Sequence, residues 1–190
     1  MFKIADIPEL YKNLKVAMFD IETNGLRGDY GKIVATSVKP LDKTAKVFRI
    51  DDVGNKDMFS DKWVVRETIK ELNKFDVLVT WYGSRFDFPF INTRALRNRL
   101  LPPVKNYRRD LWITCRFNFK LARNSLEHAH RFFFGYSNKT HTTPDMWDKI
   151  LRGDKRALHW VEAHVRVDVK ETEDLYKLFA PLYPKKLRKQ

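Results

Sequence analysis

Four carboxylates in three separate segments are the side chains of this sequence best suited to carry out chemistry. Asp20 and Glu22 lie in KVAMFDIETNGL, Asp87 lies in VTWYGSRFDFPFINTRA, and Asp168 lies in HVRVDVKETEDLY. Carboxylates that meet away from water repel one another and are costly to desolvate, and a hard cation with oxygen ligands removes both costs. The four acids therefore indicate a site for two divalent cations, an arrangement that serves phosphodiester chemistry.

The first two acids stand at the end of an apolar segment. Residues 15–21 are mostly apolar and are bounded by the turn-like residues 23–25, which predicts a buried strand. Because side chains alternate between the faces of a strand, Asp20 and Glu22 project to the same side. Apolar residues precede them on both faces, so we expect a central strand. The alternative is a strand end that frays into solvent, where two acids cost nothing.

Asp87 follows a second predicted strand, residues 76–81, and a turn at residues 82–85. A helix is predicted from Phe86 to about Asn98, because a proline lies in its first turn. One interpretation is that Asp87 only caps this helix. Capping does not account for the aromatic residues around it, which are Trp81, Tyr82, Phe86, Phe88 and Phe90.

Asp168 lies on a third predicted element, a helix over residues 155–179. His164, Asp168, Thr172 and Leu175 recur at helical spacing and share one face. The imidazole and the carboxylate are therefore neighbours, one turn apart. They could form a pair on the helix surface, or a metal-bound Asp with His164 as a general base.

In this order and at this spacing, the three segments resemble the DEDD superfamily of 3′–5′ exonucleases, which have a ribonuclease H-like fold. DIETNGL is similar to the family's first motif, and WYGSRFDFPFINTRA is most similar to the second motif of family B DNA polymerase exonuclease domains. HVRVDVKETEDLY is similar to the third, so the resemblance covers residues 16–176. It implies an α/β fold: a mixed five-stranded ribonuclease H-like sheet flanked by helices.

The resemblance also implies a mechanism. Two Mg²⁺ or Mn²⁺ ions would be held by Asp20, Glu22, Asp87 and Asp168, with His164 as the general base. Family members have a Tyr four residues before the last Asp or a His five before it, whereas His164 lies four before Asp168. Many relatives also have Asn before the Gly of the second motif, where this chain has Tyr82.

Four further residues are implied as substrate contacts by the same resemblance. Thr23 is placed to contact the 3′-terminal nucleotide, and Leu26, Phe86 and Phe90 to stack on or wedge between bases of a single strand. For Phe90, packing in the core is the favoured alternative.

The rest of the chain predicts the remaining elements of one domain over residues 1–190. Strands are expected at residues 32–39, 45–51 and 109–112, and helices at 62–73, 125–134 (with Ser125 as its cap) and from Pro144. Residues 132–134, three phenylalanines, are expected to pack in the core. Asp145 and Asp148 are interpreted as the solvated face of the helix that begins at Pro144.

The composition favours a nucleic acid partner. Lys and Arg number 37 against 24 acids, which gives a formal net charge of +13 and a pI near 9.8. Nine basic residues and a single acid lie between Arg94 and Arg123, and a short basic tail begins at about residue 184. Runs of this kind are usually solvated faces, but beside a phosphodiester site they indicate phosphate contacts.

The sequence as a whole predicts a 3′–5′ exonuclease that acts on single-stranded DNA, with RNA as the alternative substrate. An endonuclease or ribonuclease on the same fold, and a binding module with little hydrolysis, are the other hypotheses. We expect a monomer that takes part in replication or repair with a protein partner and has no membrane segment. Cys115 is the only cysteine, which fits the reducing cytoplasm of a cell, and the small basic chain would also suit a phage or viral genome.

Overall fold

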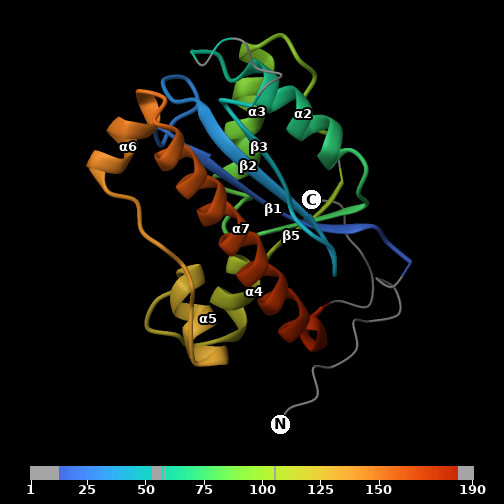
Figure 1. Ribbon diagram of the computed structural model, residues 1–190. Helices are drawn as coiled ribbons and strands as arrows, with labels where there is room; N and C mark the ends of the chain where they lie inside the picture. Colours follow the sequence, from blue (N-terminus) through green and yellow to red (C-terminus); the bar gives the residue numbers. More distant parts are fainter. Residues whose placement is uncertain (1–12, 53–56, 58, 105, 184–190) are drawn as a thin grey trace.

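A computed structural model describes residues 13–52, 57, 59–104 and 106–183 (Figure 1). The predicted basic tail from residue 184 lies outside this described part of the chain. The described residues form a five-stranded sheet in the order β3-β2-β1-β4-β5. The strands are β1 (Val16–Thr23), β2 (Ile33–Pro40), β3 (Lys46–Arg49), β4 (Val77–Thr80) and β5 (Tyr107–Asp110). Strands β1, β2 and β3 pair antiparallel, and β4 runs parallel to both β1 and β5. The mixed five-stranded sheet predicted from the sequence is thereby confirmed.

Helices cover both faces of this sheet. They are α2 (Lys62–Leu72), α3 (Asp87–Arg97), α4 (Leu111–Asn118), α5 (Leu126–Phe134), α6 (Pro144–Leu151) and α7 (Lys155–Leu178), followed by the short 3₁₀ helix η1 (Ala180–Leu182). In Figure 1 the long α7 crosses one face diagonally, while α2 and α3 lie on the other. No helix in the described ranges is both long and apolar enough to cross a membrane.

Strand β1 is the central strand, as its apolar sequence predicts. Ala17, Phe19 and Ile21 belong to one core cluster, and Val16 and Met18 to the other. The alternation that buries these residues also directs Asp20 and Glu22 to the face on which Val16 and Met18 lie. The strand therefore fixes the direction of both carboxylates.

The structure corrects the prediction of a strand over residues 109–112. Strand β5 ends at Asp110, and Leu111 and Trp112 already belong to α4, a helix that the sequence interpretation missed. The side chain of Asp110 accepts a hydrogen bond from the backbone N–H of Trp112 at 3.0 Å and so caps the helix. The β-prone residues after Asp110 concealed this cap.

The three phenylalanines at residues 132–134 were predicted to lie in the core, and this is wrong for one of them. Phe133 and Phe134 pack against the core around η1, but Phe132 is 64% exposed. Each residue of a helix is rotated by about 100° from the one before it, so three consecutive side chains cannot all point toward one apolar face.

A buried ion pair fastens α3, the helix that begins with Asp87, to the rest of the fold. Arg94 binds both carboxylate oxygens of Asp61, Nε to Oδ2 at 2.7 Å and Nη2 to Oδ1 at 2.8 Å. The same carboxylate accepts hydrogen bonds from the backbone N–H of Ile33 and from the side chain of Asn98. The start of β2, the residue before α2 and the end of α3 therefore meet at one carboxylate.

Candidate active site

The fold brings the predicted site residues together from three elements. Asp20 and Glu22 leave the end of β1, Asp87 opens α3, and Asp168 lies in the middle of α7, the helix that crosses this part of the sheet. Asp20, Glu22 and Asp168 line one cleft of about 440 Å³. Asp87 approaches from the other side of β1, where its Oδ1 accepts a hydrogen bond from the backbone N–H of Ile21 at 3.1 Å.

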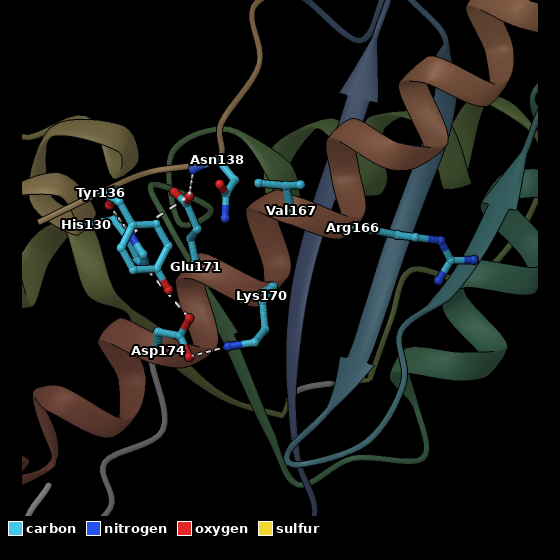
Figure 2. Close-up of a pocket in the computed structure, with 8 residues that line it drawn as sticks. All are labelled: His130, Tyr136, Asn138, Arg166, Val167, Lys170, Glu171 and Asp174. Carbon is cyan, nitrogen blue, oxygen red and sulfur yellow. Dashed lines mark hydrogen bonds and ion pairs between the residues drawn. The ribbon is translucent and has the colours of Figure 1, made fainter. Parts of the chain in front are cut away.

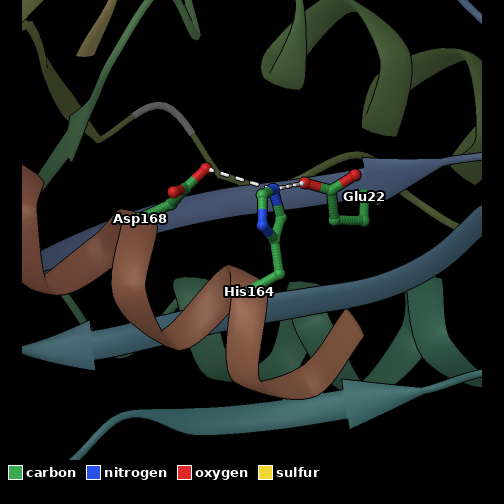
Figure 3. Close-up of side chains that lie close together, drawn as sticks. All are labelled: Glu22, His164 and Asp168. Atoms are coloured by element: carbon green, nitrogen blue, oxygen red, sulfur yellow. Dashed lines mark ion pairs between the residues drawn. The ribbon is translucent and has the colours of Figure 1, made fainter. Parts of the chain in front are cut away.

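Figure 3 shows Glu22 and Asp168 on either side of the imidazole of His164. Nε2 of His164 lies 3.1 Å from Oε1 of Glu22 and 3.8 Å from Oδ2 of Asp168. One ligand atom from each of the three residues lies within 4.8 Å of the others, which is close enough to share a cation. The surface His–Asp pair considered from the sequence is ruled out, because both residues are buried.

Two carboxylate oxygens of the site are buried without a hydrogen-bond partner in the described part of the chain: Oδ2 of Asp20 and Oδ1 of Asp168. Burial raises the pKa of Asp20 well above its usual value, and the charges of Asp168, Asp87 and Glu22 raise it further. Buried carboxylate oxygens without hydrogen-bond partners repel one another, and a hard divalent cation that binds them removes this repulsion and satisfies their lone pairs. The residues present therefore fit the expected Mg²⁺ or Mn²⁺ ions.

Asp87 does not cap its helix, so the capping interpretation is wrong. The capping position belongs to Phe86, and no side chain there bonds a free backbone N–H. Burial raises the pKa of Asp87 to about 8, against the opposing effect of two backbone N–H groups, its own and that of Ile21, that donate to the carboxylate. A buried acid in the first turn of a helix, held against the end of β1, is oriented toward the site.

Two residues that the sequence interpretation missed also lie in the site. The loop at residues 138–143 looked only polar, yet Lys139 Nζ forms an ion pair with Oδ2 of Asp168. The next residue, Thr140, places Oγ1 2.6 Å from Nδ1 of His164 in a hydrogen bond. No local pattern marks either residue, because their place depends on how the loop lies against α7.

The indole ring of Trp160 stacks on the imidazole of His164 and fixes the plane of that imidazole. The two rings stack with centroids 5.1 Å apart and planes 15° apart. Because residues four apart lie on one helix face, the four-residue spacing between His164 and Asp168 still directs both side chains into the site.

Tyr82, which stands where many DEDD exonucleases have Asn, adopts a left-handed backbone conformation with φ of 67°. Asn tolerates this region better than an aromatic residue does. Asp110 supports the turn by accepting hydrogen bonds from the backbone N–H groups of Tyr82 and Ser84, at 2.9 and 3.0 Å. The Tyr82 ring contacts Trp112 edge to face, with centroids 5.0 Å apart.

Three of the four predicted substrate contacts line the 440 Å³ cleft, namely Thr23, Leu26 and Phe86. Leu26 is 86% exposed, and Thr23 donates a hydrogen bond to the carbonyl of Gly25 at 2.7 Å. Phe90 is only 3% exposed and belongs to the core cluster, which favours the core interpretation of this residue.

A second cleft of about 460 Å³ opens on the other side of Lys139. It shares Asp20, Lys139 and Asp168 with the first cleft, and its aromatic wall contains Trp81 and Trp112. The carboxylate site therefore lies between two open clefts, with the Lys139 side chain on the boundary.

The raised pKa values predict how stability depends on pH. The unfolded carboxyls titrate near 3.8, so between about pH 4 and pH 8 the folded, cation-free protein holds more protons than the unfolded chain. Stability then falls as pH rises through this window, and a cation that binds the ionised carboxylates reverses the loss. We expect the Tm without divalent cations to be lower at pH 8 than at pH 5.5, and Mn²⁺ to raise the Tm more at pH 8. An unchanged Tm with Mn²⁺ at pH 8, measured by scanning calorimetry, would contradict the assignment of a cation site.

Comparisons with known proteins agree with this fold. The family model of the RNase_H superfamily matches residues 17–180. None of the curated proteins gives a significant match. Among solved structures, the family B DNA polymerase from the hyperthermophilic archaeon Pyrobaculum calidifontis is similar with a TM-score of 0.61 and 20% identity. The similarity covers 86% of this chain and 24% of the polymerase, so the chain spans about a quarter of that protein's length. The implied ribonuclease H-like fold is confirmed, and the chain belongs to the RNase H superfamily.

Proposed function

We propose that this protein is a metal-dependent 3′–5′ exonuclease that hydrolyses phosphodiester bonds at the 3′ end of single-stranded nucleic acid, with DNA as the favoured substrate. Its membership of the RNase H superfamily supports nuclease activity in general. The observation that carries the finer proposal is that Asp20, Glu22 and Asp168 line one cleft with two orphaned carboxylate oxygens, while Asp87 is held against the end of the same strand.

In this proposal the four carboxylates would hold two Mg²⁺ or Mn²⁺ ions, which would supply activation of a water and stabilisation of the charge on the leaving 3′ oxygen. The protein supplies the rest. Thr140 can accept the Nδ1–H of His164, and the unprotonated Nε2, which lies 3.1 Å from Oε1 of Glu22, is then the acceptor for the proton of the attacking water. Stacking on Trp160 keeps the ring from turning away.

Recognition of a strand end is assigned to the cleft that Thr23, Leu26 and Phe86 line. An exposed apolar side chain and a half-buried aromatic ring beside carboxylates can hold unstacked bases, and stacking of this kind tolerates any sequence. The net charge of +13 supplies attraction to the phosphates, so binding should weaken as salt rises.

The proposal is tested with a single-stranded oligonucleotide in linear form and in circular form. An exonuclease degrades only the linear strand, whereas an endonuclease on the same fold cuts both. A DNA oligonucleotide and an RNA oligonucleotide of the same sequence then establish the sugar preference. Cleavage of the circle at a rate similar to that of the linear strand would overturn the proposed exonuclease.

Replacing His164 by Ala is expected to lower kcat by about 10²- to 10³-fold, because the water loses its proton acceptor while the carboxylates remain. The matched control is His159→Ala, which removes an exposed histidine from the same helix and should leave kcat unchanged. A His164→Ala variant with nearly full activity at neutral pH would exclude this residue as the base.

One observation favours a second function, a binding module with little hydrolysis. The ammonium group of Lys139 already neutralises Asp168, one of the proposed metal ligands. If this ion pair persisted in the presence of Mg²⁺ or Mn²⁺, nucleic acid would bind in a salt-sensitive way and remain intact. Retention of a labelled strand without cleavage in either metal would support this second function.

A further inference from the structure

Three residues of α7 contact the segment of residues 137–140, and two of them belong to the site described above. Thr140 contacts His164, and Lys139 contacts Asp168. The third residue is Glu171, which lies seven residues after His164 and therefore on the same helix face. Its carboxylate accepts a hydrogen bond from the backbone N–H of Asn138 at 2.6 Å (Figure 2). It also accepts one from Ser137 Oγ at 2.9 Å.

Glu171 is nearly as inaccessible as a core residue, with 2% of its surface exposed. Ser137 Oγ lies 2.9 Å from both carboxylate oxygens, and the same hydroxyl accepts a hydrogen bond from the backbone N–H of Lys139 at 3.2 Å. A buried carboxylate is retained only where hydrogen bonds offset its desolvation, and here those hydrogen bonds all come from one short segment. Glu171 thus fixes the backbone from which the Lys139 and Thr140 side chains project.

The nearby His130 also binds the chain just before the segment of residues 137–140. His130 donates its Nδ1–H to the carbonyl of Tyr136 at 2.7 Å, and its ring stacks on Phe134. His130, Tyr136, Asn138 and Glu171 line one pocket of about 320 Å³, and Figure 2 shows these side chains beside α7. In the described part of the chain, the side-chain hydrogen bonds and ion pairs of His130 and Glu171 do not reach any of the four proposed metal ligands, so we expect these two residues to act on the site through the segment.

We propose that Glu171 is a positioning residue: it holds residues 137–140 against α7 so that Lys139 meets Asp168 and Thr140 meets His164. A Lys side chain has many rotamers, and it stays on one carboxylate oxygen only when its backbone is held nearby. Without Glu171 the segment can move, the Nδ1 of His164 loses its partner, and the charge of Lys139 leaves the carboxylates. This inference rests on the proposed nuclease function only for its effect on rate.

The test compares Glu171→Ala with two other variants. Glu171→Gln keeps an acceptor for the Asn138 N–H and a group that can bond Ser137, so it should restore most of the wild-type behaviour. Glu173→Ala is the matched control: Glu173 lies two residues away on α7, is also 2% exposed, and accepts a backbone N–H from a different loop, that of Asp42 at 2.7 Å. Both Ala variants should lose stability, but only Glu171→Ala should affect the site.

The first readouts do not depend on catalysis. Hydrogen exchange at the Asn138 amide should accelerate in Glu171→Ala and remain slow in Glu173→Ala. Binding of Mn²⁺, measured by calorimetry, should tighten in Glu171→Ala as it does in Lys139→Met, because in both the ammonium group no longer competes for Asp168. Combining the two substitutions should tighten binding no further. An unchanged exchange rate at Asn138, or additive effects on Mn²⁺ binding, would overturn the proposal.

The rate provides the second readout. We expect kcat of Glu171→Ala to fall about 10- to 100-fold with a much smaller change in KM, as for other residues that orient catalytic groups through hydrogen bonds. In a Lys139→Met, Thr140→Val background the same substitution should cost less than about twofold, since the groups that it positions are already gone. An equal loss in both backgrounds would refute the positioning role. If the wild-type chain hydrolyses nothing, the proposed function fails, while exchange and Mn²⁺ binding still decide the role of Glu171.

Discussion

Replacing Asp20 by Asn is expected to abolish hydrolysis and also to raise the Tm of the cation-free protein at pH 8. The charges of the other three carboxylates act on Asp20 and raise its pKa, and one of its oxygens is buried without a hydrogen-bond partner in the described part of the chain. The amide cannot serve as an anionic ligand, so we expect kcat to fall by at least ~10³-fold, equivalent to about 4 kcal/mol of transition-state stabilisation. The same change removes a charge that burial and three like charges disfavour, and stability without cations should increase.

The size of the stability effect depends on pH. Near pH 4 the Asp20 carboxyl is protonated in the folded protein, so the Asn variant and the wild type should have similar Tm values. The gap should widen as the pH rises toward 8, because the unfolded wild type releases the Asp20 proton while burial and like charges disfavour that release in the folded protein. Asp145→Asn, which removes an exposed acid from α6, serves as the control and should change neither activity nor Tm. Activity within tenfold of the wild type, or a lower Tm at pH 8, would show that Asp20 has another role.

Replacing Arg94 by Ala is expected to lower the free energy of unfolding by about 3–5 kcal/mol, because it leaves the carboxylate of Asp61 buried without its charged partner. Asp61 is 0% exposed, and within the described residues its carboxylate would keep the hydrogen bonds from Ile33 and Asn98 alone. The loss would also loosen α3, and with it the orientation of Asp87 toward the end of β1. Urea unfolding followed by tryptophan fluorescence measures the change.

Two further variants separate this effect from a general weakness of α3. Arg97→Ala removes an exposed arginine from the same helix and should cost less than about 0.5 kcal/mol. The double variant Asp61→Asn, Arg94→Met removes both charges, so it should be more stable than Arg94→Ala alone. If the double variant is the weaker of the two, an unpaired buried charge is not the cause.

The elements that carry the four carboxylates could be predicted because their sequences are strongly patterned. The apolar alternation of β1 fixes the side to which Asp20 and Glu22 point, and the periodicity of α7 places His164 beside Asp168. The proline in the first turn of α3 marks its start. Each of these signals lies within about ten residues of the acid that it positions, so local physics suffices.

Other parts of the site depend on contacts between distant residues, which one sequence does not reveal. Lys139 and Thr140 lie in a loop without periodicity, and they reach the site because Glu171, more than 30 residues later, holds that loop. Asp110 ends β5 and caps α4 in a stretch whose β-prone residues favoured a longer strand. The exposure of Phe132 also depends on distant contacts, because the packing of α5 decides which of the three phenylalanines faces solvent.

The central claim is hydrolysis from the 3′ end by carboxylate-bound cations, and a 5′-labelled single-stranded DNA oligonucleotide tests it most directly. The oligonucleotide is incubated with Mg²⁺ or Mn²⁺, beside an EDTA control and an Asp168→Ala variant. We predict a ladder of labelled products that shortens from the 3′ end and is absent from both controls. A label released at once as a mononucleotide, or a ladder that persists in Asp168→Ala, would contradict the account.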